Sequence, residues 1–192
     1  AESTLPKGEQ IGTENVKEGD HIKVYVSEVK IMDKGPKIMI SRSHPNFVKK
    51  LFESEIPEIN DGTVEIKSVS REAGSRSKIA VFSHNPNVDA VGSCIGSHGS
   101  RLSAIIEELG GEKIDLIEYS DEPEKYVAAA LAPANVIKVE FDPEVPGVCR
   151  ATVPDNQLSL SIGNRGQNVR LAAKLTGYKI DIRPESGFYG EN

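Results

Sequence analysis

The sequence predicts an α+β fold class, in which two copies of one α-β-β-α-α-β module follow the end of a small β-barrel. Three observations predict this fold: an internal repeat centred on a Gly-x-x-Gly turn, paired strand-like runs upstream of each turn, and a separate pair of strand-like runs near the N-terminus. A repeat of this kind indicates that one structural unit occurs twice. Strand pairs that alternate with helices favour small sheets with helices on one face.

Two strand-like runs come first along the chain, at residues 20–29 and 36–41, with a turn at residues 33–36 between them. Two strands alone are too little sheet for a stable domain. We therefore expect residues 1–42 to form only the last part of a β-barrel, whose earlier strands lie outside this sequence.

The first copy of the module is expected at residues 43–119. Its strand-like runs are rich in β-branched residues, and the helix after its glycine turn has apolar residues at helical spacing. In chain order the expected elements are a helix at 45–52, strands at 62–71 and 77–83, the glycine turn at 96–99, a helix that ends near 109 and a strand from 113.

The second copy is expected at residues 120–186, followed by a tail at 187–192. Its expected elements are a helix at 122–131, strands at 136–141 and 148–153, the glycine turn at 163–166, a helix that ends before Gly177 and a strand from 179. On the helix after this turn we expect Val169, Ala172 and Ala173 to face the core, with Leu171 and Leu175 beside them.

The composition narrows the functional classes. Hydrophobic residues make up 38% and charged residues 27% of the 192 residues, which is typical of a folded globular protein. No run approaches the roughly 18–20 apolar residues of a membrane span, and the first residues lack the apolar stretch of a secretory signal. Cys94 and Cys149 are too few for a disulfide framework or a zinc site. We therefore expect a cytoplasmic protein with no membrane partner, no bound metal and no cofactor.

The Gly-x-x-Gly turn is the element that predicts function. A helix N-terminus presents unpaired backbone N–H groups and the positive end of the helix dipole. Glycines on both sides of two polar residues remove the side chains that would keep a phosphate at a distance. The groove behind such a turn accommodates about four unstacked bases, as in RNA-binding modules with a GXXG loop, and it excludes a duplex. We therefore predict that the chain binds single-stranded RNA.

The expected RNA contacts are the two turns and the residues that flank them. In the first copy these residues are Ile95, Gly96, Ser97, His98 and Gly99. In the second copy they are Ile162, Gly163, Asn164, Arg165, Gly166, Arg170 and Lys174.

The charge distribution predicts that the two turns differ. The formal net charge of −6 argues against generic binding to polyanions, but between residues 161 and 183 five basic side chains oppose Asp181 alone. Arg165 brings a cation to the second turn, whereas His98 in the first turn is mostly neutral at pH 7. We therefore expect the second turn, supported by Arg170 and Lys174, to hold phosphate more strongly.

Other functional classes remain open at this point. An enzyme that acts on a phosphorylated small molecule would need a metal-binding acid or a general base near a turn, and the sequence indicates neither; we expect no catalytic residues. An RNA-binding fragment of an RNA-degrading phosphorolytic enzyme would usually have one copy of the module, placed before the barrel, whereas this sequence predicts two copies after it. A third alternative is a protein-binding scaffold whose turns have lost contact with RNA.

Several blocks of the sequence resemble the NusA family of bacterial transcription elongation and termination factors. The most specific blocks are residues 68–81, 91–101 and 157–177, and the resemblance covers nearly the whole chain. It runs from the end of the family's S1 domain, an OB-type barrel, through two type II KH domains. The resemblance implies RNA contacts from Gly96 to Arg101 and from Gly163 to Arg170, which adds Ser100, Arg101, Gln167 and Asn168 to the expected contact residues. The family often carries a more basic pair at the place of Ser97 and His98.

The resemblance also implies a biological role. It implies a factor that travels with RNA polymerase, binds nascent or leader RNA, and modulates pausing, termination and antitermination. RNA polymerase and other elongation or antitermination factors would then be partners of the full-length protein, and this part of the protein is expected to be monomeric.

Overall fold

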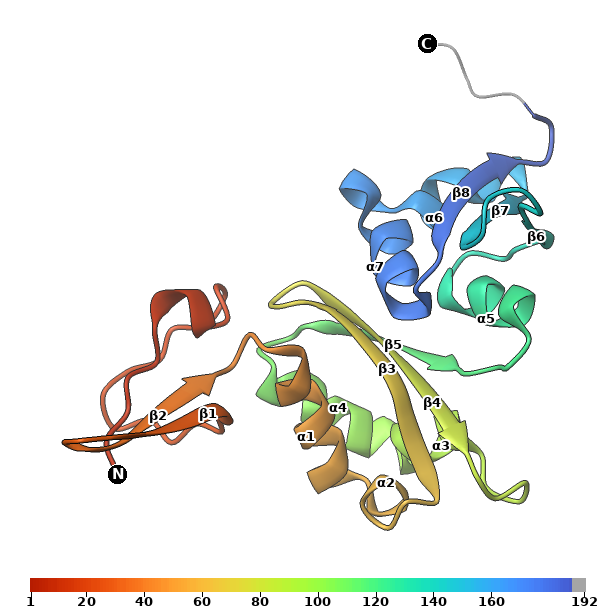
Figure 1. Cartoon of the computed structure of the whole chain (residues 1–192). Coiled ribbons are helices and arrows are strands. Elements are labelled where there is room, and N and C mark those ends of the chain that lie inside the picture. Colours follow the sequence, from red (N-terminus) through yellow and green to blue (C-terminus); the bar gives the residue numbers. More distant parts are fainter. Residues whose placement is uncertain (188–192) are drawn as a thin grey trace.

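Three small sheets organise the chain in the computed structural model, which describes residues 1–187 (Figure 1). The predicted tail at 187–192 lies almost wholly outside these residues. The elements in order are β1 (Tyr25–Met32), β2 (Gly35–Ser41), α1 (Pro45–Glu55), α2 (Pro57–Asn60), β3 (Val64–Glu72), β4 (Arg76–Ser83), α3 (Ala90–Ile95), α4 (Ser100–Glu108), β5 (Lys113–Glu118), α5 (Pro123–Ala130), β6 (Lys138–Phe141), β7 (Val148–Val153), α6 (Leu158–Ile162), α7 (Gln167–Thr176) and β8 (Lys179–Pro184).

The internal repeat forms the same fold twice, which confirms the predicted fold class. In the first module (α1 to β5) the sheet order is β3-β4-β5, and in the second module (α5 to β8) it is β6-β7-β8. The first pair of strands in each sheet is antiparallel and the second pair is parallel. The return of the last strand in parallel requires the chain to cross the sheet, and the two helices around each glycine turn make this crossing.

The first module has its sheet covered on both faces. Its own helices bury one face, where Phe47 and Phe52 of α1 meet Ile79 and Val81 of β4 and Ile105 of α4. The other face packs against the second module, whose α5 and α7 lie above the β3-β4-β5 sheet in Figure 1.

The interface between the modules is a continuous apolar core. The first module contributes Ala80 of β4 and Ile117 of β5 to this core. The second module contributes Val127 of α5, Leu131 directly after α5, and Leu175 of α7. All five residues are buried. Burial of apolar surface at about 25 cal/mol per Å² is the main source of stability for such an interface.

A buried lysine spans this interface. Lys78 of β4 is fully buried, and its Nζ donates to Asp115 Oδ2 at 3.0 Å and to the carbonyl of Ala132 at 2.7 Å. Asp115 also pairs with Arg76, whose Nε lies 2.6 Å from Oδ2. Burial lowers the pKa of Lys78, and the Asp115 carboxylate opposes this effect. Lys78 therefore links the sheet of the first module to the segment after α5 of the second.

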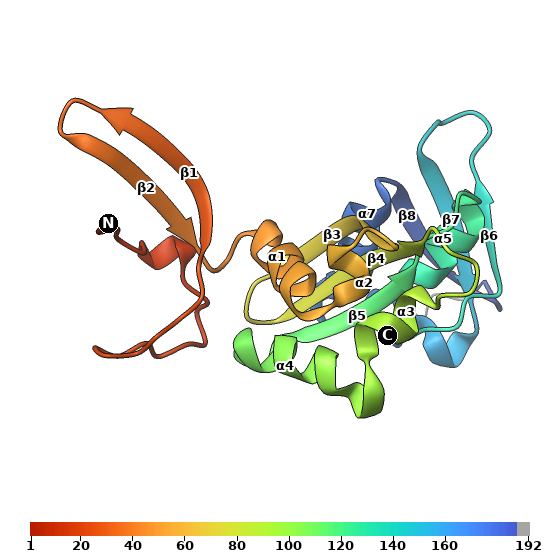
Figure 2. The ribbon, with the colours of Figure 1, turned by 90° about the horizontal axis from the view of Figure 1, so that it is seen from below.

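The N-terminal segment is fastened to the first module by buried arginines. Arg42 donates from Nε to Glu14 Oε2 at 2.9 Å and from Nη2 to the carbonyl of Glu108 at 2.9 Å. Arg71 and Glu112 form a fully buried pair, and Arg71 also donates to the carbonyl of Arg42 at 2.7 Å. Figure 2 shows the β1–β2 hairpin standing off from both modules at the α1 end.

Several element ends and one set of core residues differ from the sequence prediction. β1 begins at Tyr25 and not at residue 20, because β2 ends at Ser41, the partner of Tyr25, and leaves earlier residues unpaired. The first helix continues beyond residue 52 to Glu55, and the short helix α2 follows it. The predicted core stripe of α7 is confirmed in part. Ala172 is buried, but Val169 and Ala173 are only half-buried, and the other buried residues of the helix are Asn168, Leu171 and Leu175.

Replacement of Lys78 tests the link between the modules. We expect Lys78→Met to lower the free energy of unfolding by about 3 kcal/mol, because the Ala132 carbonyl loses its donor and Asp115 loses a cation in a buried site. Lys113→Met is the matched control, because Lys113 is exposed on β5; we expect it to change stability by less than about 0.5 kcal/mol. Urea denaturation measures both. Equal stability of the two variants would contradict the linking role.

Candidate nucleic-acid interface

The two glycine turns have the same backbone conformation. The first glycine of each turn has φ/ψ of 74°/177° at Gly96 and 78°/171° at Gly163. The last glycine has 74°/11° at Gly99 and 73°/15° at Gly166. Two turns that agree this closely, each at the start of a long helix, point to one shared function and not to two unrelated connections.

The third position of each turn holds a residue with positive φ. His98 and Arg165 both have φ of 52°, and they are the only non-glycine residues with positive φ among residues 1–187. Such a conformation costs energy for a residue with a Cβ and is often found at functional sites. It directs both side chains into solvent, where His98 and Arg165 are exposed.

The first glycine of each turn is required by close packing. A Cβ at Gly163 would lie 2.7 Å from the backbone nitrogen of Asn168. A Cβ at Gly96 would lie 2.7 Å from Cγ of Arg101, at the corresponding position. By contrast, the nearest atom to a Cβ at Gly166 would be Arg170 Nη1 at 3.9 Å. The outer side of the turn is therefore open to a ligand, and the inner side is closed.

Most of the predicted contact residues lie around these open surfaces. The exposed ones are Ile95, Ser97, His98, Ser100, Asn164, Arg165, Arg170 and Lys174. Ile162, Gly163, Gly166 and Gln167 are partly buried, as are Gly96, Gly99 and Arg101. The geometry thus brings the predicted residues of each module together at the start of α4 or α7.

Asn168 is a correction to the predicted contact set. Its side chain is fully buried, and Nδ2 donates to the carbonyls of Leu131 at 3.0 Å and Ser161 at 2.9 Å. It therefore joins α7 to α6 and to the end of α5, and it has no surface to offer to RNA. The family resemblance implied a contact at Asn168, but its side chain is buried, where two hydrogen bonds satisfy its donor group.

Three other predicted residues already have partners within the protein. Arg101 Nη1 donates to Glu58 Oε2 at 2.8 Å and to the carbonyl of Ser93 at 2.7 Å. Gln167 and Arg170 both reach Glu72 of the first module. Sequence reasoning missed Glu58 and Glu72, because no spacing signal connects residues so far apart along the chain.

The two cysteines are not nucleophiles. Cys94 and Cys149 are buried free thiols. Burial raises the pKa of Cys94 to about 12 and that of Cys149 to about 11. Only the thiolate is reactive, so these side chains serve as core residues.

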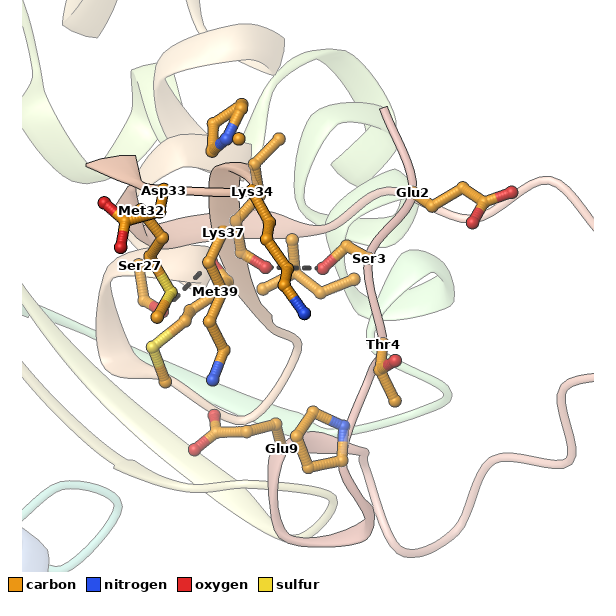
Figure 3. A pocket seen from close by; sticks show the side chains of 15 residues that line it. Glu2, Ser3, Thr4, Glu9, Ser27, Met32, Asp33, Lys34, Lys37 and Met39 are labelled. Carbon is orange, nitrogen blue, oxygen red and sulfur yellow. Dashed lines mark hydrogen bonds between the residues drawn. The ribbon is translucent and has the colours of Figure 1, made fainter. Parts of the chain in front are cut away.

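A large cavity lies away from both turns. It has a volume of about 910 Å³ and lies between the β1–β2 hairpin and residues 2–9. Figure 3 shows Met32, Met39, Lys34 and Lys37 around it, and the Ser3 hydroxyl donates to the carbonyl of Ile38 at 2.6 Å. Size alone does not identify a site, and no predicted contact residue lines this cavity.

Residues 1–187 offer neither a metal site nor a membrane-spanning helix. No group of three or more His, Cys, Asp or Glu side chains is arranged to hold a metal ion. Within the same range, no helix is both long and apolar enough to cross a membrane.

Comparison with known proteins identifies the family. Residues 42–119 match the NusA-like first KH domain, and residues 123–189 match the NusA-like second KH domain. The chain belongs to the NusA family. The transcription termination/antitermination protein NusA of Halalkalibacterium halodurans is 56% identical over 185 residues, which are 96% of this chain and 48% of that protein. The transcription termination/antitermination protein NusA of Bacillus subtilis is 55% identical over 185 residues, which are 96% of this chain and 50% of that protein.

More distant similarities agree with this membership. NusA of Thermus thermophilus is 50% identical over 179 residues, which are 93% of this chain and 46% of that protein. The chain thus spans about half the length of the curated relatives that it matches. The crystal structure of APE1850 aligns with 72% of this chain and 97% of its own at a TM-score of 0.54 and 23% identity. At that identity the likeness supports the fold alone.

Alanine at the two glycines of the second turn tests the steric argument. Gly163→Ala combines a clash with backbone and a conformation that costs about 1–3 kcal/mol for a residue with a Cβ. Gly166→Ala enters open space and costs only the left-handed conformation, about 1–2 kcal/mol. We expect Gly163→Ala to reduce the free energy of unfolding more, as measured in urea. Equal losses would contradict the steric requirement.

Proposed function

We propose that this chain is the single-stranded RNA-binding part of a transcription factor that modulates RNA polymerase pausing, termination and antitermination. The proposal rests on one observation: two glycine turns with matching backbone angles begin helices in two modules that share an apolar core. RNA phosphates lie against the open sides of the turns, and bases lie in the grooves beside them.

Family membership supports the biological role. The curated relatives are named for transcription termination and antitermination, and the RNA would accordingly be a nascent or leader transcript. RNA polymerase and other elongation or antitermination factors are proposed partners of the full-length protein. The proposed setting is the cytoplasm, with this part of the protein monomeric and not an enzyme. The proposed division is an S1 part at 1–42 and KH modules at 43–119 and 120–186.

A charge-reversal variant tests RNA binding at the turns. We expect Asp at all four variable positions, Ser97, His98, Asn164 and Arg165, to abolish binding of a short oligouridine, because carboxylates repel phosphate. Asp tolerates the left-handed conformation of the third position, so the fold should persist. The matched control has Asn at the same positions, and we expect it to retain weakened binding. RNA binding that survived in the folded Asp variant would refute the mechanism.

Single substitutions test the expected inequality of the two turns. We expect Arg165→Asn to weaken RNA binding and to reduce the slope of log affinity against log salt by about 0.7, the value for one phosphate contact on a single strand. His98→Asn should change both quantities less, because imidazole is mostly neutral at pH 7. Asn is chosen because it accommodates positive φ. An equal or larger effect of His98→Asn would contradict the stronger grip of the second turn.

A further inference from the structure

The second glycine turn is contacted by a carboxylate of the first module. Glu72, the last residue of β3, accepts from Arg170 Nε at 2.7 Å and from Gln167 Nε2 at 2.8 Å. Gln167 Nε2 also lies 2.7 Å from Ser75 Oγ, in the turn between β3 and β4. We call Glu72, Ser75, Gln167 and Arg170 the cross-module clamp. It brings the β3–β4 turn of one module to the RNA-binding turn of the other.

Arg170 connects the clamp directly to the turn. Its Nη1 donates to the carbonyl of Arg165, the residue with positive φ, at 3.1 Å. A Cβ at Gly166 would lie 3.9 Å from the same nitrogen. The guanidinium group of Arg170 therefore lies beside the surface where a phosphate would approach.

The first turn has no arginine at the position of Arg170; its Arg101 lies at the position of Asn168 and pairs with Glu58 of the same module. The helical positions that correspond to Gln167 and Arg170 are Ser100 and Ser103, and a Cβ at Gly99 would lie 3.8 Å from Ser103 Oγ. A short neutral hydroxyl thus occupies the place that the arginine takes in the second module. The cross-module clamp therefore occurs at the second turn and has no counterpart at the first.

Glu72 offsets the charge of Arg170 in the free protein. The hydrogen bond from Arg170 lowers the pKa of Glu72 most, and the hydrogen bond from Gln167 lowers it further, so the carboxylate is ionised at neutral pH. The side chains of Arg170 and Glu72 are 44% and 28% exposed. An ion pair this exposed contributes little to stability, so another anion can compete for the arginine.

We propose that Glu72 restrains RNA binding at the second turn, because it holds and neutralises an arginine that would otherwise contact phosphate. This inference rests on the proposed binding of single-stranded RNA at that turn. When RNA binds, its phosphate competes with Glu72 for Arg170, so the affinity of the second module depends on a residue of the first.

Glu72→Gln tests this restraint. The amide keeps the shape of the side chain but removes its charge, which releases Arg170 to the phosphate. We expect a short oligouridine to bind about threefold more tightly in low salt, with a salt slope steeper by about 0.7, which corresponds to one added phosphate contact. The gain should disappear in high salt. Affinity that was unchanged or lower would overturn the proposal.

Two further variants separate the clamp from a general charge effect. Glu65→Gln makes the same change of net charge on the same strand, at an exposed residue that pairs with His84 and Lys67; we expect no gain in affinity. Glu72→Gln combined with Arg170→Ala removes both members of the pair, and we expect affinity and salt slope to return to the wild-type values. A gain that persisted in the double variant, or that appeared equally in Glu65→Gln, would refute the role of Arg170.

The same measurements distinguish this inference from the proposed function. If the turns do not bind RNA, Arg165→Asn and Glu72→Gln both leave oligouridine binding unchanged. If only the restraint is wrong, Arg165→Asn weakens binding while Glu72→Gln does not strengthen it. Thermal unfolding of each variant establishes that the modules remain docked.

Discussion

The docking of α5 and α7 on the outer face of the first sheet determines how the rest of the molecule is arranged. The two sheets carry a related pair of charges at the same register, Lys78 opposite Asp115 and Arg150 opposite Asp181. Lys78 is fully buried and bonded to Ala132 of the second module, whereas the side chain of Arg150 is 58% exposed. The same cation–carboxylate arrangement is therefore an internal link in one copy and a solvated surface pair in the other.

This docking makes the two glycine turns parts of one body. Helix α7 begins at the second turn and packs on β3 and β4, so the sheet of the first module fixes where that turn lies. Asn168 is the second residue of α7, and its side chain donates to the carbonyl of Leu131. The next residue, Ala132, accepts the hydrogen bond from Lys78. Interface and turn therefore share a short stretch of backbone, and a change at either one affects the position of the other.

The sequence predicts local structure well and contacts between the modules poorly. The strand expected at residues 148–153 coincides with β7 at both ends, and the glycine spacing located both turns. By contrast, the resemblance implied that Asn168 contacts RNA, but its partners are carbonyls that only the folded chain brings near. Glu72 and Arg170 are 98 residues apart along the chain, and no periodicity connects them.

An acidic chain that binds a polyanion must leave positive charge free where the phosphates lie. Here several buried and half-buried cations already face carboxylates: Arg42, Arg71, Arg76, Lys78 and Arg101. Arg165 forms no ion pair with any residue among 1–187, so it brings an unpaired charge to the second turn. In the proposed complex few phosphates are neutralised by side chains, and backbone N–H groups at the turns and contacts to unstacked bases supply much of the affinity. On this proposal, shape selects a single strand, and the paired charge at Glu72 and Arg170 adjusts how tightly it is held.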